Sequence, residues 1–269
     1  MIRIAVDAMG GDRGPEEVVA GALDARTSDV APVLVGPRGL DTQGLELIEA
    51  PDVIAMDDKP TDAVRAKPDS SLVRACRAVG DGDAQAVVSA GNTGAMLAAC
   101  LLEVRRLRGV RRPAIAVTIP SRSGATVLLD SGANADARPE DLVQFAHMGA
   151  VFAEEILDVR NPQVRLLSIG EEDEKGNQLT LEAHELLAAT DLNFGGNTEG
   201  RDLLRGGADV VVTDGFTGNV ALKLLEGTIK TVLETLRREA SITTSSAASL
   251  RGWLDRRRLY DRRDFPGPH

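Results

Sequence analysis

The sequence predicts an α/β protein in three layers, with a largely parallel sheet covered by helices on both faces. Apolar runs typical of buried strands alternate along the chain with segments whose apolar residues follow the helical period. Between them a junction rich in Gly, Asn and Asp recurs, most clearly in IRIAVDAMGGD over residues 2–12. Such junctions lie at the carboxyl ends of parallel strands, where open α/β sheets bind their ligands.

The expected elements follow one another in regular succession. Runs rich in Val, Ile, Leu and Ala predict strands at residues 2–6, 31–36, 86–90, 114–120, 125–130 and 208–213. Helical periods predict helices over residues 15–26, 41–48, 70–79, 94–108, 139–157 and 176–189, and an amphipathic helix from residue 221. The first helix has Pro15 in its first turn and Glu16 and Glu17 beside the positive end of its dipole. The charge-rich segment over residues 56–69 predicts a solvated loop, with a lid or a partner surface as the alternative.

Composition excludes several classes of function. A chain of 269 residues can bury the core of one large domain or of two lobes. The net charge of −10 disfavours nucleic acid as a partner, and an aromatic content of 3% argues against base-stacking surfaces. The sequence has no GxGxxG after its first strand, no GK dipeptide and no GxSxG, which disfavours dehydrogenases, P-loop NTPases and serine hydrolases. Cys76 and Cys100 stand in helix-like surroundings and are expected to be buried reduced thiols.

The repeated junctions point to an enzyme that handles phosphate or another oxyanion. Glycines allow backbone N–H groups to approach an anion, and a helix N-terminus adds unpaired donors. The simpler alternative is that each junction only turns the chain from strand to helix. The acidic residues at strand ends are expected to cap these loops rather than to bind a metal, and no cofactor is expected: Asp7, Asp12, Asp130 and Asp214.

Six ordered motifs resemble a known family. VDAMGGD, SAGNTGA, IPSRSG with LLDSGAN, IGEEDEKGN, NFGGNTEGRD and DGFTGNVALK together resemble the acyl-ACP:phosphate acyltransferase family (PlsX) of bacterial phospholipid synthesis, over about residues 1–240. The resemblance implies a fold similar to phosphotransacetylases and isocitrate dehydrogenases, and a homodimer. It also implies that an acyl phosphate forms from inorganic phosphate and the acylated form of acyl carrier protein (acyl-ACP). A membrane glycerol-3-phosphate acyltransferase would consume that product.

Phosphate attack on a thioester needs a held anion and donors aimed at the developing oxyanion, but no Ser or Cys nucleophile. The predicted catalytic residues are one cation, Lys175, and four amide side chains, Asn92, Asn177, Asn197 and Asn219. The predicted phosphate and substrate contacts are Gly10, Gly11, Asp12, Gly91, Thr93, Gly94, Asn134, Asp214 and Gly215. The alternative for Lys175 is a surface lysine that pairs with Glu172 or Glu174.

The residues are also compatible with other functions. A phosphotransacetylase acting on small acyl-CoA is one alternative, and a dehydrogenase of similar fold acting on hydroxy acids is another. A third is an inactive adaptor that binds acyl carrier protein. We expect a catalytic α/β domain over residues 1–236 and an amphipathic tail over residues 237–269 that is shortened or diverged relative to the family.

The tail has a net positive charge, in contrast to the net charge of −10 of the whole chain. Residues 237–264 contain eight arginines and four acidic residues, and Leu250, Trp253 and Leu254 stand among them. A basic amphipathic element of this kind favours a peripheral membrane contact, with a helix pair at a dimer interface as the alternative. The chain opens directly into a strand without a signal peptide, and no apolar run reaches the ~20 residues of a membrane span. We therefore expect a cytoplasmic protein.

Overall fold

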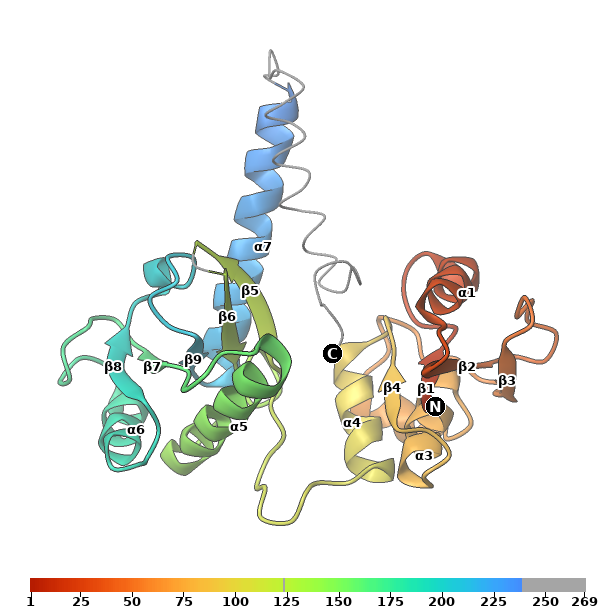
Figure 1. Cartoon of the computed structure of the whole chain (residues 1–269), viewed down its shortest axis with the longest axis horizontal. Coiled ribbons are helices and arrows are strands. Elements are labelled where there is room, and N and C mark those ends of the chain that lie inside the picture. Colours follow the sequence, from red (N-terminus) through yellow and green to blue (C-terminus); the bar gives the residue numbers. More distant parts are fainter. Residues whose placement is uncertain (123, 239–269) are drawn as a thin grey trace. The chain divides into compact units, whose positions relative to one another are not determined.

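The computed structural model describes residues 1–122 and 124–238, and these form two compact units that divide between Arg111 and Arg112. Each unit has its own sheet (Figure 1). The predicted α/β class with largely parallel strands is confirmed, although two sheets build it instead of one. The expected tail over residues 237–269 stays a prediction, because Leu250, Trp253, Leu254 and the other residues from 239 onward lie outside the described part of the chain.

Unit 1 contains a parallel sheet of four strands in the order β3-β2-β1-β4. Its elements are β1 (Ile2–Asp7), α1 (Gly14–Ala25), β2 (Val30–Gly36), β3 (Glu46–Glu49), α2 (Pro60–Ala66), α3 (Ser71–Gly80), β4 (Ala86–Val88) and α4 (Thr93–Glu103). Neighbouring side chains of β1 face opposite sides of the sheet. Ala5 joins the cluster around α3, whereas Val6 joins the cluster around α1. Helices thus cover both faces, as predicted.

Three predictions in unit 1 were wrong. The expected short helix over residues 41–48 is a turn followed by β3, because Gln43 and Gly44 both adopt positive φ angles (48° and 88°) that end any helix there. The expected loop over residues 56–69 contains α2, which begins with Pro60 in its first turn. The helix predicted to reach residue 108 ends at Glu103, because Arg105 turns to a φ of 70°.

Unit 2 contains five strands in the order β5-β6-β9-β7-β8, and only β5 and β6 are antiparallel. Its elements are β5 (Val117–Ser121), β6 (Gly124–Leu129), α5 (Pro139–Leu157), β7 (Val164–Leu167), α6 (Gln178–Ala188), β8 (Phe194–Thr198), the 3-10 turn Gly200–Asp202, β9 (Val210–Val212) and α7 (Gly215–Arg238). The predicted strand pair around residues 121–124 and the helices of residues 139–157 and 176–189 are confirmed.

The core of unit 2 lies on both faces of its sheet. Val127 and Leu129 of β6 pack in the cluster that contains Phe145 of α5, while Leu128 between them packs in the cluster against α7. The alternation follows from the two-residue period of a strand. None of the described helices combines the length and the apolar character that a bilayer crossing requires.

Candidate functional site

The predicted glycine junction of unit 1 is a close contact between two loops. Because β1 and β4 are parallel neighbours, the loops after them meet at one edge of the sheet. The Ser89 hydroxyl donates to Asp7 Oδ2 at 2.7 Å, and the Gly91 N–H donates to Ser89 Oγ at 3.0 Å. A Cβ atom on Gly10 would lie 2.7 Å from Gly91 N, so this glycine is needed for the two backbones to approach. Gly11 has a φ of 100° and its Cβ position faces Ala90. The adjacent Asp12 is exposed.

Asn92 holds two segments of unit 1 together. Its Oδ1 accepts the Ala95 N–H at 3.0 Å and caps α4, while its Nδ2 donates to the carbonyl oxygens of Met56 and Asp58. Both amide hydrogens that the sequence prediction offered to a substrate are therefore used inside the protein. The two residues that follow Asn92 lie at the same contact between loops and helices of unit 1. Thr93 begins α4, and a Cβ on Gly94 would lie 2.7 Å from Pro60 Cγ of α2.

The acidic residues at strand ends cap loops, as predicted, at three of the four positions. Asp7 accepts the Met9 N–H, and Asp214 accepts both the N–H and the hydroxyl of Thr217. Asp130 accepts four backbone N–H groups, from Ile115, Gly132, Ala133 and Asn134. Within the described ranges no three His, Cys, Asp or Glu side chains gather closely enough to hold a metal ion.

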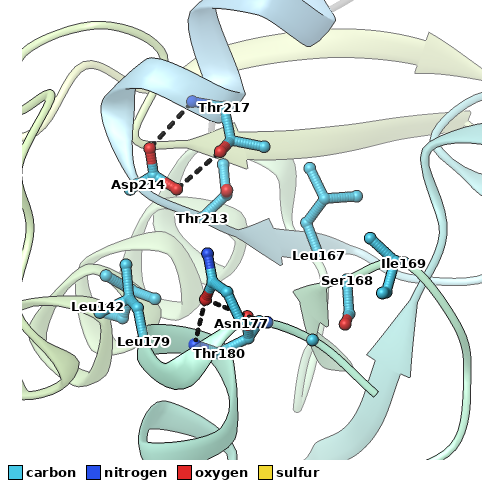
Figure 2. Close-up of a pocket in the computed structure, with 11 residues that line it drawn as sticks. Leu142, Leu167, Ser168, Ile169, Asn177, Leu179, Thr180, Thr213, Asp214 and Thr217 are labelled. Atoms are coloured by element: carbon cyan, nitrogen blue, oxygen red, sulfur yellow. Dashed lines mark hydrogen bonds between the residues drawn. The ribbon is translucent and has the colours of Figure 1, made fainter.

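A pocket of about 320 Å³ opens in unit 2 where β7 and β9 end (Figure 2). Its lining consists of Leu142, Leu167, Ser168, Ile169, Gly176, Asn177, Leu179, Thr180, Thr213, Asp214 and Thr217. Because β7 and β9 are adjacent and parallel, the helices that follow them, α6 and α7, both begin beside it. The positive ends of two helix dipoles therefore lie close to the pocket.

Asn177 is an exposed polar residue in the lining of this pocket. Its Oδ1 accepts the N–H of Thr180 at 2.9 Å and the hydroxyl of Thr180 at 2.6 Å, which caps α6. Its Nδ2 consequently points the other way, toward Thr213 (Figure 2), and has no hydrogen-bond partner among the described residues. An amide donor aimed into a cavity at a helix N-terminus is suited to bind an anion.

Lys175 lies two residues before Asn177, in a loop whose backbone is held firmly. Its N–H donates to the carbonyl oxygen of Glu172 at 3.0 Å, and its own carbonyl accepts from the Ser168 hydroxyl at 2.7 Å. The exposed ammonium makes no ion pair within 4.0 Å with any residue in the described part of the chain, although residues 171–174 are all acidic. The alternative pairing with Glu172 or Glu174 is therefore not formed in this structure.

The remaining predicted amides are used by the protein itself or lie outside the pocket. Asn197 is 2% exposed, and its Nδ2 donates to the carbonyl oxygen of Glu172 at 2.8 Å. Asn134 donates from Nδ2 to the Pro113 carbonyl and to Asp130. Asn219 is exposed on α7 beside Gly132.

Asn177 and Asp214 are thus the predicted residues that line this pocket, while Lys175 and Gly215 are next in the chain to the lining residues Gly176 and Asp214. The sequence prediction missed its hydroxyl groups, on Ser168, Thr180, Thr213 and Thr217. Two of these residues could have been predicted, because Thr180 and Thr217 each stand three residues after a predicted site residue that could cap a helix.

Comparisons with known proteins show relatives over most of the chain. A family model described as fatty acid synthesis protein matches residues 2–259. A phosphate acyltransferase of Bacillus pumilus (strain SAFR-032) is 48% identical over 258 residues, which are 93% of this chain and 77% of the relative. A phosphate acyltransferase of Geobacillus sp. (strain WCH70) is 47% identical and covers 97% of this chain and 81% of the relative. The predicted family resemblance is confirmed.

Solved structures with this fold include two transferases. The EutD phosphotransacetylase from Staphylococcus aureus has a TM-score of 0.60 at 18% identity and covers 84% of this chain and 82% of its own. A branched-chain phosphotransacylase from Enterococcus faecalis V583 has a TM-score of 0.63 at 20% identity, over 84% of each chain. At these identities the likeness concerns the fold alone, which is the fold predicted from the sequence.

Proposed function

The chain belongs to the phosphate acyltransferase family of fatty acid synthesis proteins, and on this basis we propose that it transfers a fatty acyl group from acyl-ACP to inorganic phosphate. The product is an acyl phosphate for phospholipid synthesis. The observation that carries the proposal beyond the family is the amide donor Asn177 Nδ2, which has no hydrogen-bond partner among the described residues and lines the pocket at the N-terminus of α6, with the cation Lys175 two residues before it in the chain. A free donor and a free charge beside a helix N-terminus favour a phosphate ligand.

The reaction follows from what phosphate and thioesters do. A phosphate oxygen attacks the carbonyl carbon of the thioester, a C–O bond forms, and the carbonyl oxygen gains negative charge. The C–S bond then breaks, the sulfur leaves as a thiolate that takes up a proton, and the acyl phosphate departs. Because phosphate is itself the nucleophile, the protein has only to bind it, align it and stabilise the oxyanion.

The pocket divides these tasks between its polar and apolar walls. Lys175 supplies positive charge for the phosphate, and Asn177 supplies a directed N–H donor. Asp214 adds negative charge to the rim, but both of its oxygens accept hydrogen bonds from Thr217, which moderates its repulsion of an anion. Four apolar side chains offer a surface for the carbon chain next to the thioester: Leu142, Leu167, Ile169 and Leu179.

The same proposal includes partners. Acyl carrier protein delivers the substrate, the protein acts as a homodimer in the cytoplasm, and a membrane glycerol-3-phosphate acyltransferase uses the product. Peripheral contact with the membrane would shorten the path of the acyl phosphate to that enzyme. The family resemblance supports these statements, and the net charge of −10 supports the expectation that nucleic acid is not a partner.

An assay of thiol release tests the proposal. Long-chain acyl-ACP is incubated with the protein, with and without inorganic phosphate, and both the free thiol and the acyl phosphate are measured. We expect both products only when phosphate is present. Equal thiol release without phosphate would identify a hydrolase instead. Turnover of acetyl-CoA but not of acyl-ACP would favour the phosphotransacetylase alternative, and binding of acyl-ACP without turnover would favour the adaptor.

A further inference from the structure

His184 is a nearly buried titratable side chain that the proposed reaction does not use. It lies on α6, its side chain is 13% exposed, and it does not line the pocket. Its ring is surrounded on three sides. Nδ1 lies 3.0 Å from Asn197 Oδ1, Nε2 lies 3.4 Å from Asp173 Oδ1, and the ring meets Phe194 edge-on at a centroid distance of 5.2 Å.

The hydrogen bonds of Asn197 determine which way its amide points. Its Nδ2 donates to the carbonyl oxygen of Glu172 at 2.8 Å and lies 3.4 Å from the carbonyl oxygen of Lys175. Carbonyl oxygens only accept, so the group that faces them must be the NH₂ group of the amide. The oxygen of the amide therefore faces His184, and His184 Nδ1 must be the donor in the bond between them.

This chain of contacts ends at the loop that carries Lys175. This loop consists of residues 168–177. It follows β7 and ends at Asn177, the N-cap of α6. The side chain of Asn197, from β8, bonds to the loop at two carbonyl groups, and one of them belongs to Lys175. Asn197 is 2% exposed, so water competes little for these bonds. The loop consequently depends on an amide that is held from both sides, by these two carbonyl oxygens and by His184 Nδ1.

We propose that His184 is a positioning residue, which holds the amide of Asn197 in the orientation that keeps Lys175 beside the pocket. The inference rests on the proposed function, because it gives the position of Lys175 its purpose. Loss of the His184 donor would leave Asn197 Oδ1 buried without a partner, which weakens the hold of this side chain on the loop, and the loop would then sample other conformations.

Two substitutions separate the hydrogen bond from the packing of the ring. His184→Leu keeps apolar bulk against Phe194 but removes the donor. His184→Asn places an NH₂ group on Cγ, where the histidine carries Nδ1, and so retains a donor to Asn197. The matched control is His147→Leu, which replaces an exposed histidine of α5 that does not line the pocket.

Each variant is measured in two ways. Hydrogen exchange, followed by mass spectrometry, reports on the peptide that spans residues 168–177. Steady-state kinetics give KM for phosphate, KM for acyl-ACP and kcat. For His184→Leu we expect clearly faster exchange of the loop and a rise of about tenfold in KM for phosphate, as for one lost contact. KM for acyl-ACP should change little, and His184→Asn should restore both values toward those of the wild type.

The outcomes distinguish the inference from the proposed function. Unchanged loop exchange in His184→Leu would overturn the inference, whatever the effect of replacing Lys175. Faster exchange with an unchanged KM for phosphate would overturn the link between His184 and phosphate binding, and Lys175→Ala would then decide whether the role of Lys175 itself stands. Failure of His184→Asn to restore the loop would also overturn the inference, because the ring and not its donor would then be required.

Discussion

Asn177 and Thr180 form a reciprocal pair at the start of α6. The Asn177 N–H donates to Thr180 Oγ1 at 3.1 Å, while Asn177 Oδ1 accepts from both the N–H and the hydroxyl of Thr180. This capping box begins the helix, and at the same time it turns the second half of the Asn177 side chain, the NH₂ group, into the pocket (Figure 2). The atoms of Asn177 that cap the helix are thus distinct from the NH₂ group that we propose to bind phosphate.

The first prediction separates these two uses of Asn177. Asn177→Asp keeps an oxygen for the cap but loses the donor and adds negative charge to the pocket. We expect its thermal stability to stay near that of the wild type while phosphate use falls by about a hundredfold or more. Asn177→Ala should lose about 1 kcal/mol of stability in addition, because it removes the cap. Phosphate saturation and thermal unfolding, measured together, check both. Normal phosphate use by Asn177→Asp would show that its NH₂ group has no role in binding.

The second prediction concerns the charge of Lys175. Lys175→Ala should raise KM for phosphate by about ten- to a hundredfold, since a charge-assisted contact is worth roughly 1.5 to 3 kcal/mol. The melting temperature should change little, because the side chain is exposed and makes no ion pair with the described residues. Lys223→Ala is the control, because Lys223 is an exposed lysine that pairs with Glu226 on α7. Equal saturation curves for the two variants would show that Lys175 is only solvated.

A third prediction tests the role of Gly94 as a packing residue. Gly94→Ala should lower the free energy of unfolding by about 1–3 kcal/mol, because the new methyl group meets the ring of Pro60. Gly21 provides the opposite case, since it is exposed in α1 and a Cβ there meets no atom within 4 Å. Gly21→Ala should therefore stabilise the protein by about 0.5–1 kcal/mol. Chemical denaturation of both variants checks the contrast. If both gain stability, the α2–α4 contact is looser than the structure indicates.

A fourth prediction concerns the two cysteines, whose Sγ atoms are 3.6 Å apart. Cys76 is buried as predicted, whereas Cys100 is only half-buried. The hydrogen bond from Cys76 lowers the pKa of Cys100, while the same bond and burial raise the pKa of Cys76. Iodoacetamide should therefore modify Cys100 before Cys76, and it should do so at pH values below the ordinary pKa of a thiol. Mass spectrometry of the peptides identifies the site. Cys76→Ala should slow the reaction at Cys100, and faster modification of Cys76 would contradict this assignment.

The fifth prediction is a dependence of stability on pH. Two hydrogen bonds from Arg3 lower the pKa of Glu46 below its ordinary value of 4.5. A carboxylate with a lowered folded pKa stabilises the fold above its unfolded pKa, and this contribution is lost as the pH falls through the folded pKa. The stability difference between the wild type and Glu46→Gln should thus be constant above about pH 5 and shrink in acid. Denaturation curves across this pH range check the prediction.

The Glu46 side chain is 55% exposed, so the difference should also shrink at high salt. A difference that grows in acid would contradict the sign.

Much of the fold was predictable because its signals are local. The long helix Pro139–Leu157 follows from its apolar period and its N-terminal proline, and β6 and β9 follow from short apolar runs. Where local signals were weak, prediction was wrong. The segment that forms β3 has four residues, and only pairing with β2 makes it a strand. Tertiary contacts also position α2, because its Pro60 packs against Gly94 and the segment before it is held by Asn92 through Met56 and Asp58.

The sequence by itself determined the α/β class, the order of most elements and three of the four acidic caps. Only the tertiary structure decided which amides are free to bind a ligand. Asn92 and Asn134 stand in loops of the same kind as that of Asn177, and Asn197 stands near the end of β8, yet packing brings carbonyl oxygens to these three side chains. An amide donor is satisfied by whatever acceptor the fold places within about 3 Å. For these asparagines the acceptors are distant in sequence, and no local pattern could reveal them.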